Sequence, residues 1–184
     1  MFETARLILR EYSPEDFVSL HAILSDPETM KFWPAPFTEE QTKGWIERCI
    51  RSYRASSSPC LRRDFGRWAV ILKENGLQIG DAGIISAEVN DKTENDLGYI
   101  IHKNFWKLGY GYEAASACIK YGFEKLGIRR MVANMAFDNF ASIRVAEKIG
   151  MKKECEFQNN RNRQILTYLF SLENNQGKKL HSFS

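Results

Sequence analysis

The sequence predicts a single α/β domain, built on a mixed β-sheet with helices on both faces. Its 184 residues suit one domain, and a chain of this length can bury a core without disulfides or a structural metal. Apolar runs mark about seven strands, and helix start signals precede several of the segments between them. An antiparallel meander precedes residue 95, whereas strand–helix–strand crossovers follow it and imply parallel neighbours.

The chain is expected to begin with one strand and two helices. Residues 5–11 are strand-like, because Leu7 and Leu9 alternate with Arg6, Ile8 and Arg10. Ser13, followed by a proline at the first helical position, begins a short helix that ends near Leu24. Thr38, with Gln41 three residues later, matches a capping box and begins the second helix.

A hairpin and a further strand are expected next. Residues 67–73 and 77–89 are strand-like, and the Asn-Gly pair between them is a strong hairpin signal. The polar residues 90–95 predict a turn of that length before a strand at 96–102.

The second half of the chain alternates helices and strands. A glycine-rich turn leads into a long helix that ends near Gly127, and a later helix is closed by Gly150. The whole of 1–174 is expected to form the domain, and 175–184 a frayed tail. In order, the remaining elements are a strand at 129–137, a helix at 138–150, and strands at 152–157 and 164–173.

Composition excludes several classes of function. A net charge of +3 is too small to argue for nucleic acid, and the short basic segments are typical of solvated loops. No window reaches the ~18 apolar residues of a membrane span, and no secretory leader is evident, so we expect a cytoplasmic protein without a membrane partner. The cysteines and histidines lack metal-ligand spacing, so no metal is expected. A monomer and a homodimer are both compatible with the sequence.

The turn around Gly109 and Gly111 is the strongest chemical signal. N–H groups at a helix start lack intrahelical acceptors, and the helix dipole adds positive charge there. Glycines allow a close approach, and Lys107 adds charge, so the turn suits a pyrophosphate group. A plain tight turn is the alternative interpretation.

The same turn resembles a known signature. Residues 106–111 (WKLGYG) resemble the Q/R-x-x-G-x-G/A acetyl-CoA motif of GNAT acetyltransferases, with Trp106 in place of Gln or Arg. That departure is typical of the branch that includes the ribosomal-protein N-terminal acetyltransferases RimJ and RimL. Tyr110 and Glu113 match the branch's form of the turn, and 97–99 (LGY) resemble its preceding strand.

A second block supports the resemblance. Residues 139–142 (NFAS) and 147–151 (EKIGM) resemble the branch's N-x-x-S…EK-x-G-F/M segment, and the first and last strands also match, the latter at Tyr168. The resemblance covers nearly the whole chain. It implies a mostly antiparallel sheet with one splayed parallel strand pair, and transfer of acetyl from acetyl-CoA to a primary amine.

The resemblance also assigns the cofactor site. The strand 98–102 would diverge from 131–137, and the pantetheine arm would enter the gap between them. A strand N–H near Tyr99 or Ile100 would polarise the thioester carbonyl. The implied cofactor-binding residues are Tyr99, Ile100, Ile101, Lys107, Leu108, Gly109, Tyr110, Gly111, Tyr112, Asn139 and Ser142.

Each candidate catalytic residue also has a purely structural interpretation. Ser142 would help protonate the departing thiolate, or is an inert first-turn serine. Asn139 would bond the pantetheine amide, cap its helix, or do both. Asp96 is the candidate general base, and a solvated turn residue is the alternative.

The acceptor is the least defined part of the site. Trp33 and Phe37 lie in a proline-rich loop, where they would contact the acceptor or plug the edge of the core. The amine would be the N-terminal α-amine of a protein or belong to a small molecule. A CoA-binding module without turnover is the alternative from another class of function.

Overall fold

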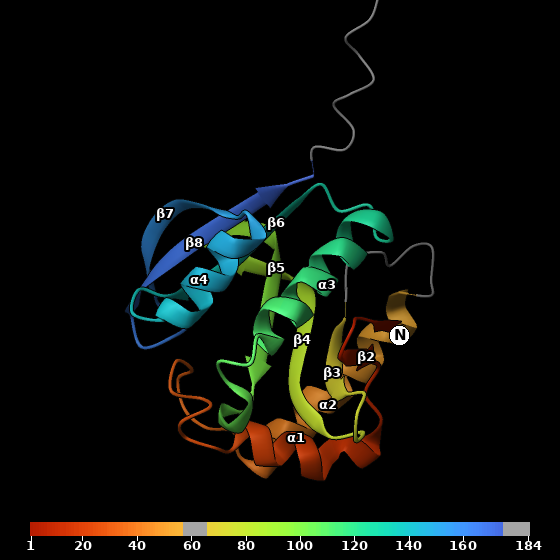
Figure 1. The fold of residues 1–184 in the computed structure, drawn as a ribbon. Coiled ribbons are helices and arrows are strands. Elements are labelled where there is room, and N and C mark those ends of the chain that lie inside the picture. Colours follow the sequence, from red (N-terminus) through yellow and green to blue (C-terminus); the bar gives the residue numbers. More distant parts are fainter. Residues whose placement is uncertain (57–65, 175–184) are drawn as a thin grey trace, which may run out of the picture.

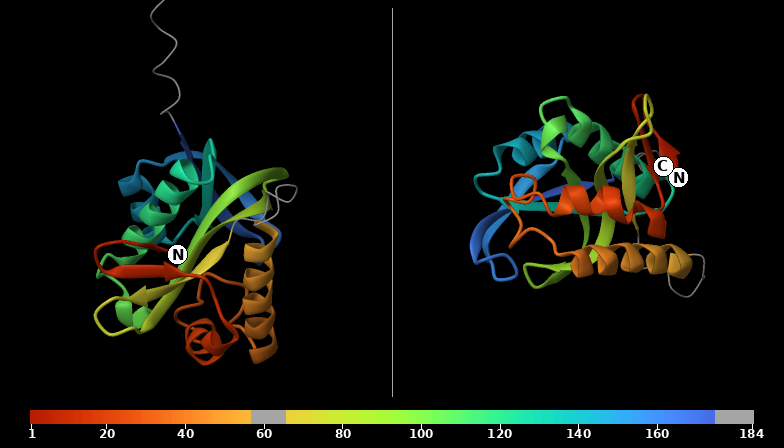
Figure 2. Two further views of the ribbon diagram at one scale, coloured as in Figure 1. Left: turned by 90° about the vertical axis from the view of Figure 1, so that its right-hand side faces the viewer. Right: turned by 90° about the horizontal axis from the view of Figure 1, so that it is seen from below.

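The computed structural model describes residues 1–56 and 66–174, which form a layered α/β domain (Figure 1). A central sheet carries α3 and α4 on one face and α1 and α2 on the other, as the three views in Figures 1 and 2 show. The predicted class, a mixed sheet with helices on both faces, is confirmed. The expected tail at 175–184 lies outside the described residues.

The sheet has eight strands in the order β1-β2-β3-β4-β5-β6-β8-β7. Every neighbouring pair is antiparallel except β5 and β6. The strand beyond the seven expected is the two-residue β1, which is too short to leave a sequence signal. The strands are β1 Phe2–Glu3, β2 Leu7–Arg10, β3 Arg67–Leu72, β4 Gln78–Val89, β5 Lys92–Ile101, β6 Arg130–Ala136, β7 Lys152–Asn159 and β8 Ile165–Glu173.

The helices begin and end on local signals. Thr38 and Gln41 exchange the two hydrogen bonds of a capping box, at 2.8 and 3.2 Å, as predicted. Gly150 closes the last helix at φ 97°, which a side chain would disfavour. The helices are α1 Phe17–Leu24, α2 Glu39–Ser56, α3 Tyr110–Glu124 and α4 Phe140–Ile149, with short 3₁₀ turns η1 Pro14–Asp16 and η2 Lys103–Phe105.

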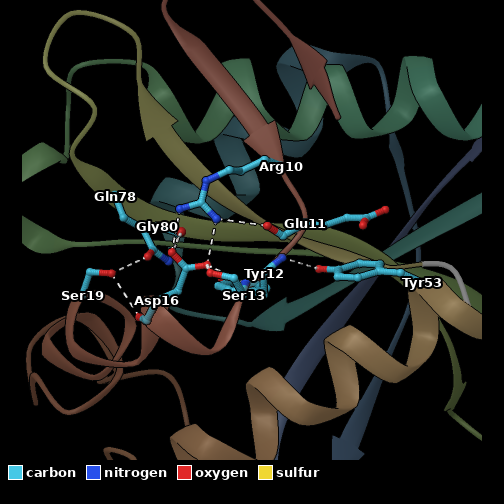
Figure 3. A network of polar contacts seen from close by, with 9 residues as sticks. All are labelled: Arg10, Glu11, Tyr12, Ser13, Asp16, Ser19, Tyr53, Gln78 and Gly80. Carbon is cyan, nitrogen blue, oxygen red and sulfur yellow. Dashed lines mark hydrogen bonds and ion pairs between the residues drawn. The ribbon is translucent and has the colours of Figure 1, made fainter.

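A polar network fixes the entry to α1 (Figure 3). Asp16 receives two bonds from the Arg10 guanidinium, at 2.8 and 2.6 Å, and one from the Ser13 N–H. Ser19 donates to Gln78 of β4 at 2.6 Å. These bonds tie the helix to two strands of the sheet, so α1 is held against the face that it covers.

The predicted turn at 90–95 is wrong, because β5 already begins at Lys92. The turn consists of Asn90 and Asp91, both in the left-handed region at φ 47° and 61°. Asn and Asp tolerate that region, and a two-residue turn of this kind matches the twist of a hairpin. As a consequence Asp96 lies within a strand, opposite Ile85 of β4.

The two faces of the sheet bury separate cores. The larger core lies between the sheet and α3, and includes Val70, Ile84 and Cys118. The smaller core lies between the sheet and the pair α1 and α2, and includes Leu20 and Ile100. Side chains in one strand therefore alternate between the two cores, and this alternation decides which residues of β5 face which helices.

The two parallel strands separate after a single pairing. Asp96 of β5 pairs with Val132 of β6, and the ladder has no further partner pair beyond this point. Residues 98–101 keep their pairing to β4, and 133–136 keep theirs to β8. The splayed strand pair is confirmed, and it leaves a gap inside the sheet.

Candidate active site

A cleft of about 760 Å³ opens where β5 and β6 separate. Its walls come from both faces of the sheet, so the cleft passes through the gap between the strands. Tyr99, Asn139 and Ser142 line it on the α3 and α4 face, and Trp45, Arg67 and Asp96 line it on the α1 and α2 face.

The turn before α3 presents free N–H groups. Gly109 is the N-cap at φ 84°, and no side chain caps the helix. The first helical bond runs from the Glu113 N–H to the Gly109 carbonyl, at 3.1 Å. The N–H groups of the preceding three residues, 110–112, have no acceptor in the described part of the chain. Lys107 and Leu108 are exposed beside them, so the turn can approach an anion closely.

Gly111 has a different role from Gly109. It lies in the first turn of α3, and it is not among the residues with positive φ. A Cβ at this position would lie 2.9 Å from the Tyr99 ring. The missing side chain therefore makes room for Tyr99, which can pack against the start of the helix.

Arg6 braces this turn, although no local pattern in the sequence indicates the contact. Its Nη1 donates to the Leu108 carbonyl at 3.0 Å, and its Nε donates to Glu113 at 2.8 Å. Its guanidinium lies 4.4 Å from the Tyr110 ring centroid. Burial alone would raise the pKa of Glu113, but bonds from Thr4 and Arg6 outweigh it and lower that pKa. Nothing local in the strand sequence reveals a partner more than a hundred residues away.

Trp106 connects the turn to the sheet. Its indole N–H donates to the carbonyl of Ile101, the last residue of β5, at 2.7 Å. This bond fixes the distance between the end of β5 and the start of α3, so the position that departs from the general motif has a structural task.

The backbone of β5 directs alternate N–H groups into the gap. The His102 N–H bonds to Ile79 of β4 at 2.9 Å. Antiparallel strands alternate such bonds, so the N–H groups of Tyr99 and Ile101 point away from β4, toward β6. Of the two expected thioester donors, Tyr99 is the one so directed, and Ile100 pairs with β4.

Tyr99, Asn139 and Ser142 meet on the α3 and α4 face. The Tyr99 hydroxyl donates to Ser142 Oγ at 3.3 Å. Asn139 caps α4 by accepting a bond from the Ser142 N–H at 3.2 Å. Burial raises the pKa of Tyr99 and outweighs the opposing effect of Ser142, so the phenol keeps its proton.

Asp96 lies on the opposite face, and the interpretation as a solvated turn residue is wrong. Its carboxyl accepts a bond from the Asn134 amide at 3.0 Å, and the side chain is half-buried in the cleft wall. Removal from water raises the pKa of Asp96 to about 7, against smaller opposing effects of Asn134 and Arg67. The carboxyl can therefore exchange a proton near neutral pH.

The acceptor side has an aromatic wall. Trp33, Phe37 and Trp45 contact one another edge to face, with centroids 5.6 to 5.9 Å apart. Trp33 and Trp45 line the cleft, whereas Phe37 lies behind them in the smaller core and is not part of the lining. Ile100 and Ile101 also bury their side chains. Only the backbone of Ile101 faces the gap, because that of Ile100 pairs with β4.

The β7–β8 turn closes over the same side. Asn162 donates to the Phe32 carbonyl at 2.7 Å, and Arg163 donates to the Lys31 carbonyl at 3.2 Å. Two loops that are far apart in sequence thus meet across the mouth of the cleft, and Phe32 and Asn162 both line it.

Comparisons with known proteins agree with this geometry. Residues 6–152 match the family model described as "Acetyltransferase (GNAT) domain". The uncharacterised N-acetyltransferase YnaD of Bacillus subtilis is 30% identical over 156 residues, which cover 84% of each chain. A GNAT acetyltransferase structure from Bacillus anthracis is 26% identical, with a TM-score of 0.74, and the match covers 93% of this chain and 96% of that one.

The fold is also shared with a structure of RimL, a ribosomal L7/L12 alpha-N-protein acetyltransferase in complex with coenzyme A. The TM-score is 0.73 at 15% identity, and the match covers 92% of this chain and 95% of that one. None of the described helices is long and apolar enough to cross a membrane. The cleft through the sheet, the uncapped helix start and the family match lead to one conclusion: the chain belongs to the GNAT acetyltransferase family, and it is an N-acetyltransferase that uses acetyl-CoA as its donor.

Proposed function

We propose that the protein transfers acetyl from acetyl-CoA to the primary amine of a small molecule, by direct attack inside the cleft. The observation that carries this proposal is the passage through the sheet between β5 and β6. The elements suited to the donor lie on one face of the sheet, and a carboxyl with a pKa near neutrality lies on the other. Donor and amine can therefore approach the gap from opposite sides.

The turn before α3 would hold the donor. The free N–H groups of 110–112 suit a pyrophosphate, and the exposed Lys107 adds positive charge. Acetyl-CoA supplies an activated acetyl group as its thioester. The Tyr99 N–H, which is directed into the gap, would bond the thioester carbonyl and stabilise the negative charge that develops there.

The amine would lose its proton on one face of the sheet, and the departing thiolate would gain a proton on the other. Asp96 would accept the proton that the amine loses, directly or through one water, and a pKa near 7 suits a base at neutral pH. Ser142 would donate a proton to the departing thiolate and take one from the Tyr99 hydroxyl, which is protonated before transfer and would regain its proton from solvent as the thiol leaves. No covalent enzyme intermediate is needed, since a neutral amine attacks the thioester itself.

The acceptor is proposed to be small because its side of the cleft is bridged. The bonds from Asn162 and Arg163 to the 31–32 backbone cross the mouth, and a protein N-terminus would have to displace them. Trp33 and Trp45 would contact the apolar part of a compact acceptor. The turn at Trp106 still supports a place in the RimJ and RimL branch. This protein would share the donor site of that branch and differ from it in the acceptor pocket.

We place this activity in the cytoplasm. The cysteines of the described part of the chain, Cys49, Cys118 and Cys155, are free thiols, which suits a reducing compartment.

The test is a panel of primary amines and N-terminal peptides, incubated with the purified protein and acetyl-CoA and followed by thiol release. We expect release with compact amines and little with peptides. Faster acetylation of peptides would contradict the small acceptor. Tight binding of acetyl-CoA in calorimetry without release for any amine would contradict catalysis, and would favour a binding module.

A further inference from the structure

Arg67 is a buried cation at the acceptor side of the cleft. Only 6% of the residue is exposed, yet it belongs to the cleft lining. It stands in β3, where every residue is buried, so the sequence places a charge at a position that normally holds an apolar side chain. A buried guanidinium is costly unless its donors are satisfied.

Two glycines form the path of this side chain across the sheet. Arg67 pairs with Gly83 of β4, and Gly83 pairs with Gly98 of β5, so the three residues form one row. A Cβ on Gly83 would lie 2.8 Å from Arg67 Cγ, and a Cβ on Gly98 would lie 2.7 Å from its Nη1. The side chain therefore crosses β4, and its tip reaches β5, the strand that borders the gap.

The described partners of the Arg67 guanidinium use only some of its N–H donors. Asp81, which is fully buried, accepts a bond from Arg67 Nε at 2.5 Å and forms an ion pair with Nη2. Tyr12 and Trp45 donate to the other oxygen of Asp81, at 2.7 and 3.2 Å. Trp45 also covers the guanidinium, 5.1 Å from its ring centroid. The carboxylate is thus held in place by three side chains.

Donors of Arg67 remain unused. Nη2 is buried and is ion-paired with Asp81 alone among the described residues, which leaves at least one of its two N–H groups without an acceptor. No described bond involves Nη1, which lies against Gly98 at the cleft. A guanidinium offers five N–H donors in a planar fork that fits a carboxylate. Asp81 and Trp45 orient the guanidinium, and some of its N–H donors have no acceptor among the described residues.

We propose that Arg67 binds a carboxylate group of the acceptor, so that the substrates are small amines that also carry a carboxylate. This inference rests on the proposed acetylation of a small amine in the same cleft. The amine would lie toward Asp96, and the carboxylate toward Arg67, which matches each charge of an amino acid with its opposite. A dianionic phosphate would fit less well, since Asp81 and Asp96 both border the position.

Three matched pairs of probes test the proposal: alanine with alaninamide, β-alanine with its amide, and 4-aminobutanoate with its amide. Each is titrated by calorimetry into the CoA-saturated protein, and each is also assayed for thiol release with acetyl-CoA. For at least one spacing between amine and carboxylate, we expect the acid to bind about tenfold or more tightly than the amide, as for a charged hydrogen-bonded pair.

The double variant Arg67→Met/Asp81→Asn removes both buried charges together, because Arg67→Met alone would leave Asp81 unpaired. For each protein, the affinity for the acid is divided by the affinity for the amide. Comparing this ratio between the wild type and the variant cancels the effect of the different basicity of the two amines. We expect the preference to disappear in the variant, while binding of acetyl-CoA and the thermal midpoint stay close to wild type. Arg130→Gln, an ion-paired arginine in β6 outside the cleft lining, is the control and should keep the preference.

The outcomes separate this inference from the function on which it rests. Thiol release with acids and amides alike would overturn the role of Arg67 and leave the acetyltransfer intact. A selective binding of acids without thiol release would support Arg67 and contradict the transfer to these amines. Failure of every acid to bind or react, or an unchanged preference in the double variant, would overturn the inference.

Discussion

Asp96 and Asp81 lie on the same face of the sheet, but their partners differ. Asp81 has the guanidinium of Arg67 and two further donors, whereas Asp96 accepts a single described hydrogen bond, from the Asn134 amide. Burial is therefore less compensated at Asp96, and its pKa rises to about 7. A group that gains and loses its proton near neutral pH is suited to take a proton from an amine.

Asp96→Asn should lower kcat by about 100-fold or more, which is the usual contribution of a general base. The wild-type rate should rise with pH through about 7, as the Asp96 carboxyl loses its proton. That rise should be absent in the variant, while the Kd of acetyl-CoA stays unchanged. A pH–rate profile of both proteins checks this, and an identical profile would show that another group is the base.

The same substitution should change how stability depends on pH. The pKa of Asp96 is higher in the folded protein than its ordinary value of 3.8, so the folded state binds the proton more tightly. Folding is thus favoured at low pH, and this advantage is lost as the pH rises from about 4 to 7. At pH 8, Asp96→Asn should be more stable than the wild type, by up to about 4 kcal/mol.

Urea unfolding at pH 5 and pH 8 measures this difference. The stabilising effect of the substitution should shrink at pH 5, where the wild-type carboxyl is already mostly protonated. An equal effect at both pH values would mean that Asp96 has an ordinary pKa.

The start of α3 depends on the backbone of Gly109. Gly109→Val should weaken acetyl-CoA binding by about tenfold or more, because φ 84° is strained for a branched side chain and the turn would shift. Gly127→Val is the matched control. It has φ 66° just beyond the other end of α3, where a Cβ meets nothing within 4 Å.

Both variants carry the same kind of strain, so they should lose similar amounts of stability in thermal unfolding. Only Gly109→Val should lose affinity in calorimetry. Equal affinities for the two would mean that the turn does not contact the donor.

Signals that act over a few residues predict most of the helices and strands, and the error at the start of β5 also arises within a few residues. The capping box at Thr38, the Asn-Gly hairpin and the glycine at the end of α4 each act over a few residues, so the sequence shows them directly. β5 begins earlier than the sequence predicts, because the polar residues 92–95 have the composition of a turn. The left-handed pair Asn90 and Asp91 makes the turn in two residues, and the strand then continues through polar side chains.

Contacts across the sheet could not be predicted in this way. The Arg67–Asp81 pair depends on the register of β3 and β4, which shifts between Val70 and Ile71. Arg6 reaches a turn more than a hundred residues away. A charged residue inside an apolar strand was the available signal for Arg67, and its meaning required the row of glycines beside it.

The acceptor side of the cleft is closed by the contact between the β7–β8 turn and the backbone of residues 31–32. Asn162→Ala removes the bond to the Phe32 carbonyl and should loosen this closure. We expect KM for a small amine to rise by about five- to tenfold, as for the loss of one hydrogen bond, with the Kd of acetyl-CoA unchanged.

Asn160→Ala is the control, because it removes an exposed amide from the same turn for which no bond is described. Steady-state kinetics of the two variants with one amine make the comparison. If Asn162→Ala instead accelerated acetylation of peptides without affecting small amines, the turn would be a barrier to larger acceptors rather than a wall for small ones.

The single pairing between β5 and β6 also has a consequence for folding. In its interior the sheet contains two strand borders without backbone partners, and one backbone bridge, at Asp96 and Val132, joins β5 to β6. A pantetheine arm laid between them would act as a ninth, non-peptide strand. The donor would then complete the protein's architecture as well as react in it, and amide hydrogens at Tyr99 and Ile101 would exchange slowly only in the loaded enzyme.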